Sequence, residues 1–258
     1  MTRSQLSNTL ECDPRIVTAD PAILYMGTPV VLISSLNENG TANLAPMSSA
    51  WWLGWGCMLG LNSTSKAVSN ILRTGQCVLN LPSEKQVASV DRLALTTGSN
   101  PVPANKLPMG FRFVEDKFGV AGLTPIDSEF VGAPRVRECP IQLEAELSVV
   151  HDFGVGNPRI RSPMKAVEVR IVRVHVAENI LREENKNRID PEKWRPLIME
   201  LPRVLRTRRQ FASIAPQPIS RRVVQASSSR RWGRLIGVGN GRFSTILSFC
   251  LPVRGEQS

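Results

Sequence analysis

Short runs of apolar residues separated by turn residues recur along most of the chain. Such runs, rich in valine, isoleucine and leucine, predict strands over 29–36, 57–61 and 76–81. The pair Asn39-Gly40 is typical of a hairpin turn and leads from the first run into a further strand at 41–45. Apolar positions between the last two runs recur at helical spacing, so we expect a helix over 66–73, ended by Gly75.

The next segment predicts a second helix and then a strand. Ser83 and Gln86 have the spacing of a capping box, which begins a helix over about 84–95. The proline-rich stretch 98–108 lacks periodicity and is expected to be a loop that covers a site or only connects elements. Strict alternation then predicts a half-buried strand over 141–151, whose outer face carries Gln142, Glu144 and Glu146.

A change of phase marks the last long strand, at 165–177. Its apolar positions shift by one residue between Ile171 and Val172, which indicates a β-bulge and leaves Arg173 and His175 pointing to solvent. Asp190-Pro191 is expected to cap and begin a short helix. Many short strands with few helices predict a single mostly-β domain, a β-barrel with a few helices.

Composition indicates a soluble globular protein of 258 residues, 42% of them hydrophobic. No apolar leader begins the chain, and no apolar run is long enough for a membrane span. Five cysteines without a C-x-x-C pair argue against a disulfide framework, so we expect free thiols in a cytoplasmic protein. With two distant histidines, His151 and His175, no metal site is expected.

The net charge of +10 comes entirely from the C-terminal tail. Residues 202–258 hold eleven of the 32 basic residues but only Glu256 of the 22 acidic ones, and the remainder carries 21 of each sign. One interpretation of this tail is an arm whose arginines bind the phosphates of a nucleic acid. A disordered extension, or a segment translated in a shifted frame, explains the same composition. We favour these two and expect no nucleic-acid partner.

Two polar clusters carry the candidate chemistry. Pro46 favours an edge or the end of a strand, beyond which the NH groups of Met47, Ser48 and Ser49 would face a planar ring with polar edges. Asn62 to Lys66 opens the first helix, where free NH groups, the helix dipole and a lysine suit a phosphate. A tight turn and ordinary helix capping are the alternatives.

The chain resembles the flavin reductase-like family with the FMN-binding split barrel. Asn43 to Trp52 and Asn62 to Lys66 carry the resemblance, with Tyr25 to Ile33, Asn80-Leu81-Pro82, Asp91 to Ala94, Pro134 to Pro140 and Trp194 to Met199. It covers about three-quarters of the chain and implies a domain at 25–200, between an extension at 1–24 and the tail at 201–258. It also implies a homodimer that completes the pocket.

By this resemblance, two segments hold FMN, with Asn80 as a weaker candidate. The ring would lie along Asn43, Ala45, Pro46, Met47, Ser48 and Ser49, and the phosphate along Ser63, Thr64, Ser65 and Lys66. Trp51, Trp52 and Trp55 are candidates for stacking on the ring, although we favour core or dimer contacts for them.

Two departures from the family pattern bear on activity. Ser162-Pro163-Met164-Lys165 stands where many flavin reductases have Gly-Asp-His, and Glu200-Leu201-Pro202-Arg203 replaces an aromatic Gly-Leu-Gly segment near the flavin.

We expect an FMN-dependent oxidoreductase. It would take electrons from NADH, NADPH or a redox partner and pass them on, for example to an oxygenase. No catalytic side chain is assigned, because hydride transfer to a flavin needs alignment rather than an acid or a nucleophile. An FMN-binding protein without turnover, and nucleic-acid binding through the tail, are the alternatives.

Overall fold

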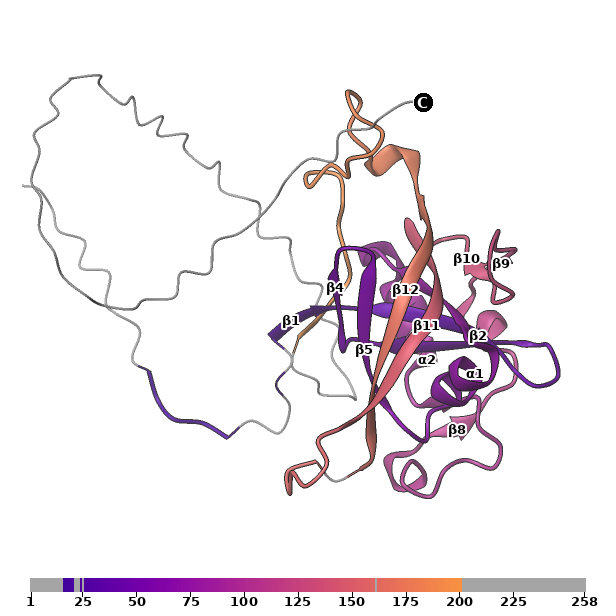
Figure 1. Ribbon diagram of the computed structural model, residues 1–258, viewed down its shortest axis with the longest axis vertical. Helices are drawn as coiled ribbons and strands as arrows, with labels where there is room; N and C mark the ends of the chain where they lie inside the picture. Colours follow the sequence, from indigo (N-terminus) through magenta and orange to yellow (C-terminus); the bar gives the residue numbers. More distant parts are fainter. Residues whose placement is uncertain (1–15, 21–23, 25, 161, 201–258) are drawn as a thin grey trace, which may run out of the picture. The chain divides into compact units, whose positions relative to one another are not determined.

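The computed structural model describes residues 16–20, 24, 26–160 and 162–200. Its centre is one antiparallel sheet of seven strands in the order β3-β2-β6-β11-β12-β5-β4 (Figure 1). The strands are β2 (Val31–Leu36), β3 (Ala42–Met47), β4 (Ala50–Leu53), β5 (Gly56–Asn62), β6 (Gln76–Leu81), β11 (Ile141–Phe153) and β12 (Met164–Val176).

The sheet closes on itself between its two edge strands. β3 and β4 lie at opposite edges of the strand order, yet only Ser48 and Ser49 separate them in the chain. Two residues cannot span a flat seven-stranded sheet, since neighbouring strands lie about 4.8 Å apart. The edges therefore meet, and the predicted mostly-β barrel is confirmed.

Local sequence signals account for the first hairpin and helix. Asn37 donates its NH to the carbonyl of Thr41 at 2.8 Å, and Gly40 has a φ of 80°, as a tight hairpin requires. Helix α1 (Lys66–Thr74) begins after Ser65, whose hydroxyl accepts from the NH of Val68, and ends at Gly75 with a φ of 69°. Both predictions are confirmed.

The second predicted helix is shorter and less regular than expected. It consists of a 3₁₀ turn, η1 (Glu84–Gln86), and α2 (Val87–Leu93). The predicted capping box is present, because Gln86 accepts from the NH of Ser83 at 3.0 Å. The helix stops early, since Ala94 is extended, with a ψ of 141°, and Leu95 takes a φ of 55°.

Hydrophobic residues pack on both faces of β2. Val31 and Ile33 belong to the barrel interior, whereas Val30 and Leu32 pack outside with Leu44 and with side chains from α2 and α3 (Lys117–Ala121). This is why residues 30–33 are continuously apolar rather than alternating.

Short elements complete the described chain. They are β1 (Met26–Pro29), β7 (Thr96–Thr97), η2 (Leu107–Met109), β8 (Arg112–Phe113), β9 (Pro125–Ile126), β10 (Arg135–Val136), η3 (Glu178–Ile180) and β13 (Ile198–Glu200). No helix among the described residues has the length and apolar character needed to cross a membrane. The extension predicted at 1–24, apart from 16–20 and 24, and the tail at 201–258 lie outside the described residues.

The long hairpin of β11 and β12 contains the predicted bulge. Glu144 pairs with Arg173 and Ala145 pairs with Ile171, so Val172 is the extra residue. Figure 1 shows this twisted ribbon running past the other strands.

The outer face of β11 was predicted to be exposed, but Gln142 and Glu144 on this face are buried. Glu144 is 0% exposed and Gln142 is 8% exposed, under the segment that carries β9 and β10. The Glu144 carboxylate accepts from the NH groups of Glu129 at 2.8 Å and Phe130 at 2.6 Å, and it lies 2.7 Å from Nε2 of His175. The prediction of a solvent-facing His175 was therefore wrong. A layer formed by distant residues covers this face, and strand periodicity cannot anticipate it.

The prediction of a short helix at Asp190 was wrong, because residues 191–193 form a turn instead. Asp190 caps it as expected, since its side chain accepts from the NH of Glu192 at 2.9 Å, and its carbonyl accepts from Trp194 at 3.0 Å. Pro196 disfavours a longer helix here, because the residue before a proline, Arg195, is biased away from helical geometry.

We expect Glu144→Gln to lower the free energy of unfolding by about 2–4 kcal/mol, because an amide offers these donors one acceptor oxygen instead of two. Burial alone would raise the pKa of Glu144, but bonds from the NH groups of Glu129 and Phe130, and then His175, outweigh it and lower the pKa below 4.5. The stabilisation is therefore complete above about pH 4.5 and is lost as pH falls through the lowered pKa. Urea denaturation should show the difference between wild type and variant shrinking below pH 4.5, and a constant difference would contradict this account.

Candidate functional site

The first predicted segment, residues 43–49, forms the end of edge strand β3 and the link to β4. β3 pairs only with β2, and no other strand bonds to its second edge. Because Pro46 has no NH, it suits an edge strand, where no hydrogen bond to a further strand is lost. The strand ends at Met47, one residue beyond Pro46, close to the predicted departure from the sheet. We call residues 43–49 the seam segment, because they lie where the barrel closes.

Two side chains of the seam segment bury polar atoms without partners. Asn43 is 1% exposed, and neither its amide nitrogen nor its amide oxygen has a hydrogen-bond partner among the described residues. Ser48 is 4% exposed, and its hydroxyl is likewise unpartnered within the described chain. Each such group costs about 1–3 kcal/mol. Buried donors and acceptors left open in this way are what a polar ligand would satisfy.

The second segment, Ser63 to Lys66, lies at the start of α1, a nine-residue helix. Its hydroxyls already have protein partners: Ser63 donates to the carbonyl of Pro163 at 3.0 Å, and Thr64 donates to Asn62 at 2.7 Å. Ser65 is the N-cap, so the capping alternative holds for this residue. Lys66 pairs with Glu38, whose side chain is 59% exposed. An arriving anion would therefore compete with a solvent-exposed carboxylate for Lys66.

Gly98 lies against both segments. A Cβ atom built on Gly98 would be 2.4 Å from Oδ1 of Asn43 and 3.2 Å from Cγ of Lys66. The proline-rich loop that begins here therefore covers Asn43 as well as connecting elements. Spacing along the chain contained no signal for this contact, which the fold alone produces.

Asn80 occupies a different position. It is 0% exposed, its amide nitrogen donates to the carbonyl of Leu32 at 3.0 Å, and its oxygen accepts from the NH of Val136 at 2.8 Å. These bonds join β2, β6 and β10. In this conformation both polar atoms of the Asn80 amide bond to backbone groups of neighbouring strands, so neither is free for a ligand.

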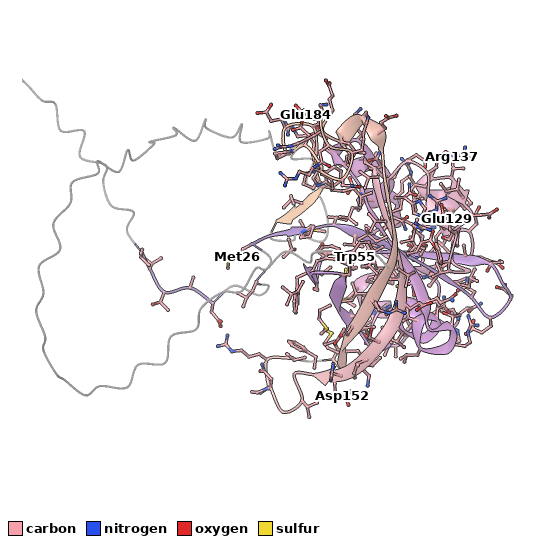
Figure 2. All side chains as sticks on the ribbon, turned by 45° about the horizontal axis from the view of Figure 1, so that its top comes forward. Met26, Trp55, Glu129, Arg137, Asp152 and Glu184 are labelled. Carbon is pink, nitrogen blue, oxygen red and sulfur yellow. The ribbon has the colours of Figure 1, made fainter. Side chains whose placement is uncertain are left out.

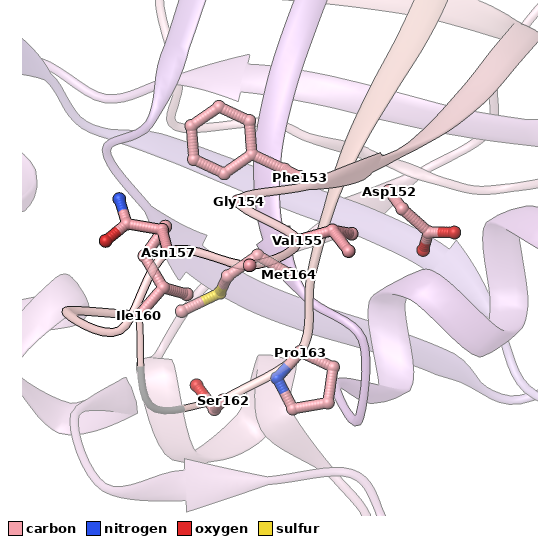
Figure 3. A pocket seen from close by; sticks show the side chains of 10 residues that line it. Asp152, Phe153, Gly154, Val155, Asn157, Ile160, Ser162, Pro163 and Met164 are labelled. Carbon is pink, nitrogen blue, oxygen red and sulfur yellow. The ribbon is translucent and has the colours of Figure 1, made fainter.

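A hollow of about 310 Å³ lies at the tip of the β11–β12 hairpin, lined by Phe153, Ile160 and Met164 among others (Figure 3). It adjoins the start of α1, because Ser63 donates its NH to Pro163 at 3.0 Å and Asn62 donates to Ser162 at 3.1 Å. No residue of the seam segment lines it. The unpartnered atoms of Asn43 and Ser48 therefore mark the candidate site better than this hollow does.

The tryptophans after the seam segment differ in their surroundings. Trp52 packs against the barrel core, whereas Trp51 is 57% exposed and Trp55 is 64% exposed. Trp55 is labelled in Figure 2. Leu53, between them, is 79% exposed. Core packing is thus confirmed for Trp52 alone, and edge strand β4 presents an apolar surface.

Two further kinds of titratable group, a lysine and two cysteines, are buried and have shifted pKa values. Lys117 is 2% exposed, and burial, with a smaller effect of Lys106, lowers its pKa to about 8. It has no acidic partner among the described residues, and sequence analysis did not single it out. Burial raises the pKa of Cys57 and of Cys77 to about 12, which makes both thiols poor nucleophiles at neutral pH.

Comparison with known proteins decides the family. Residues 23–205 match the flavin reductase like domain. The chain belongs to the flavin reductase-like family. Its relative YdfE of Bacillus subtilis (strain 168), an uncharacterised protein, is 39% identical over 178 residues, which are 69% of this chain and 83% of YdfE.

Solved structures show the same fold. Flavoredoxin from Methanosarcina acetivorans has a TM-score of 0.57 at 19% identity, covering 73% of this flavin reductase-like chain and 88% of the flavoredoxin. Nitrilotriacetate monooxygenase component B from Bacillus cereus has a TM-score of 0.55 at 21% identity, covering 71% of this chain and 91% of that one. The split-barrel fold expected from the resemblance is confirmed.

We expect Gly98→Ala to cost about 1–3 kcal/mol of stability, because the new methyl group displaces Asn43 and Lys66. Gly56→Ala is the matched control, since its Cβ would meet only the carbonyl of Leu53 at 3.4 Å. Urea denaturation of both variants measures the effect. An equal free energy of unfolding for the two variants would show that Gly98 does not pack against Asn43 and Lys66.

Proposed function

We propose that this flavin reductase-like protein binds FMN and acts as an oxidoreductase. The isoalloxazine ring would lie along the seam segment and the phosphate along Ser63 to Lys66. The buried, unpartnered amide of Asn43 is the observation that carries the proposal, because it lies against the same glycine as Lys66. Family membership supports a flavin as the ligand of these polar groups.

The residues of the two segments suit the two ends of FMN. Asn43 offers both a donor and an acceptor, and Ser48 adds a hydroxyl, which matches the mixed polar edge of the flavin ring. Ala45, Pro46 and Met47 are expected to line the ring, with Ser49 beside them. Lys66, the three hydroxyls before it and the first-turn NH groups of α1 would hold the phosphate, with Glu38 releasing Lys66.

The chemistry follows from the cofactor and the electron donor. FMN supplies the capacity to accept a hydride and to release electrons singly or in pairs. The protein's task is to orient the ring, exclude water and place donors where negative charge develops. NADH, NADPH or a protein redox partner would provide the electrons.

A homodimer and an oxygenase partner extend the proposal. Trp51, Leu53 and Trp55 leave an exposed apolar surface at edge strand β4, next to the seam segment, and a second copy is the occupant we propose for it. The structural neighbour from Bacillus cereus is a monooxygenase component, which makes an oxygenase a reasonable acceptor of electrons.

Purified protein should show a flavin absorbance spectrum, or acquire one with added FMN. The double variant Ser65→Ala/Lys66→Ala should bind FMN about tenfold or more weakly, through loss of charge-assisted bonds to the phosphate. Lys66→Ala alone keeps the helix cap, and Ser89→Ala/Lys186→Ala is the control away from the site. A protein that FMN cannot reconstitute would refute the proposed cofactor.

Consumption of NADH or NADPH, followed at 340 nm with FMN present, should be catalytic, and Asn43→Ala should slow it as FMN affinity falls. Removing one buried hydrogen-bonding group is expected to cost about 1–3 kcal/mol of binding. A protein that binds FMN tightly but oxidises neither nucleotide would instead be an FMN-binding protein without pyridine-nucleotide turnover.

A further inference from the structure

A second hollow, of about 630 Å³, lies between three parts of the chain: η1, the segment from β10 to the start of β11, and the chain around η3 and Trp194. We call it the basic cleft. Its volume is within the range of small-molecule sites. It contains no residue of the seam segment or of Ser63 to Lys66. Figure 2 shows Arg137, on its wall, far from Asp152 at the hairpin tip.

Positive charge dominates the lining of the basic cleft. Two acidic residues, Glu84 and Glu138, face five basic ones, which are Lys85, Arg135, Arg137, Lys193 and Arg195. Both carboxylate oxygens of Glu138 already accept from the NH of Thr124, at 3.0 and 3.2 Å. The cleft therefore presents positive charge to a ligand from two opposite walls.

Arg135 is held in a fixed position at the base of the cleft. Its Nη2 donates to the carbonyl of Asp127 at 2.8 Å, and its Nη1 donates to Oε1 of Gln142 at 3.0 Å. Gln142 is itself anchored, because its Nε2 donates to the carbonyls of Val136 and Cys139, both at 2.9 Å. Buried Glu144 lies 3.8 Å from Nε of Arg135. A guanidinium oriented in this way is prepared to receive an oxyanion with little loss of side-chain freedom.

Two other cations of the cleft have no side-chain partner within the part of the chain that the structure describes. Among the described residues, the side chains of Arg137 and Lys85 make no ion pair or hydrogen bond, although each lines the cleft. They belong to different walls, Arg137 next to β10 and Lys85 in η1. Apolar side chains of Ile126, Val176 and Ile180 lie among the cleft residues as well. The lining thus combines separated cations with an apolar surface.

We propose that the basic cleft binds a small organic polyanion, with at least two phosphate or carboxylate groups on an apolar body. One anionic group would meet Arg135 and Arg137, and the other would meet Lys85 on the opposite wall. Guanidinium groups match the paired oxygens of both phosphates and carboxylates. The proposal does not depend on flavin binding, since the two sets of residues share no member.

Calorimetric titration of the full chain with pyrophosphate, citrate and orthophosphate, at constant ionic strength, tests this site. Saturable binding of pyrophosphate or citrate is expected, with orthophosphate at least about tenfold weaker because it offers a single anionic group to cations that lie on two walls. Stronger pyrophosphate binding would identify a phosphate ligand, and stronger citrate binding a polycarboxylate.

The double variant Lys85→Gln/Arg137→Gln should bind the preferred anion about tenfold or more weakly. Arg230→Gln/Arg231→Gln is the matched control, since it removes the same charge from the arginine-rich tail, and it should bind like wild type. Arg112→Gln, an exposed arginine of β8 outside the cleft, controls for total charge near the barrel. Absence of saturable binding, or an equal loss in the tail variant, would overturn the proposal.

Discussion

The two-residue link between β3 and β4 is the constraint on which the rest of the structure depends. Because Ser48 and Ser49 join opposite edges of a seven-stranded sheet, the sheet must curve until those edges meet. The NH of Gly60 donates to the carbonyl of Ser49 at 2.7 Å, which extends the pairing of β4 with β5 by one residue into the link. At the seam the chain therefore leaves its pairing with β2 and begins its pairing with β5, and the side-chain polar atoms of Asn43 and Ser48 have no hydrogen-bond partner there among the described residues.

The candidate flavin site follows from that closure. The seam brings Asn43 and Ser48 into a buried position, while α1, which packs against β2, β3 and β6, contributes Lys66. The loop at Gly98 lies against both Asn43 and Lys66, since only a residue without a side chain fits there. Burial without partners costs free energy in the isolated protein. A ligand that supplies those partners recovers it, and this couples the stability of the seam to occupancy of the site.

The barrel's other polar cluster has a different physical basis. Glu144, Gln142 and Arg135 satisfy one another and nearby backbone groups, so burial of charge is compensated there. The same network orients Arg135 toward the basic cleft. At the seam, the buried polar atoms of Asn43 and Ser48 therefore lack partners among the described residues. Around Glu144, by contrast, the buried carboxylate is fully hydrogen-bonded, and the network holds Arg135 in place.

Local signals in the sequence determined much of the fold. The Asn39-Gly40 turn, the Ser65 and Gly75 caps, the Ser83–Gln86 capping box and the phase change at Val172 each depend on residues close together in the chain, and the structure contains all four. The motif residues also indicated the family and the two candidate segments. These features were predictable because hydrogen bonding and steric limits act over a few residues.

Tertiary structure decided what periodicity could not. The face of β11 that alternation assigned to solvent is covered by an earlier segment, whose residues Glu129 and Phe130 donate to Glu144. Beneath this layer Glu144 pairs with His175 of the neighbouring strand β12. Likewise, no spacing rule places Gly98 between Asn43 and Lys66, or Lys85 opposite Arg137. Sequence determined which residues could form elements and carry chemistry. Their burial and their partners depended on long-range packing, which is set by closure of the barrel rather than by any single segment.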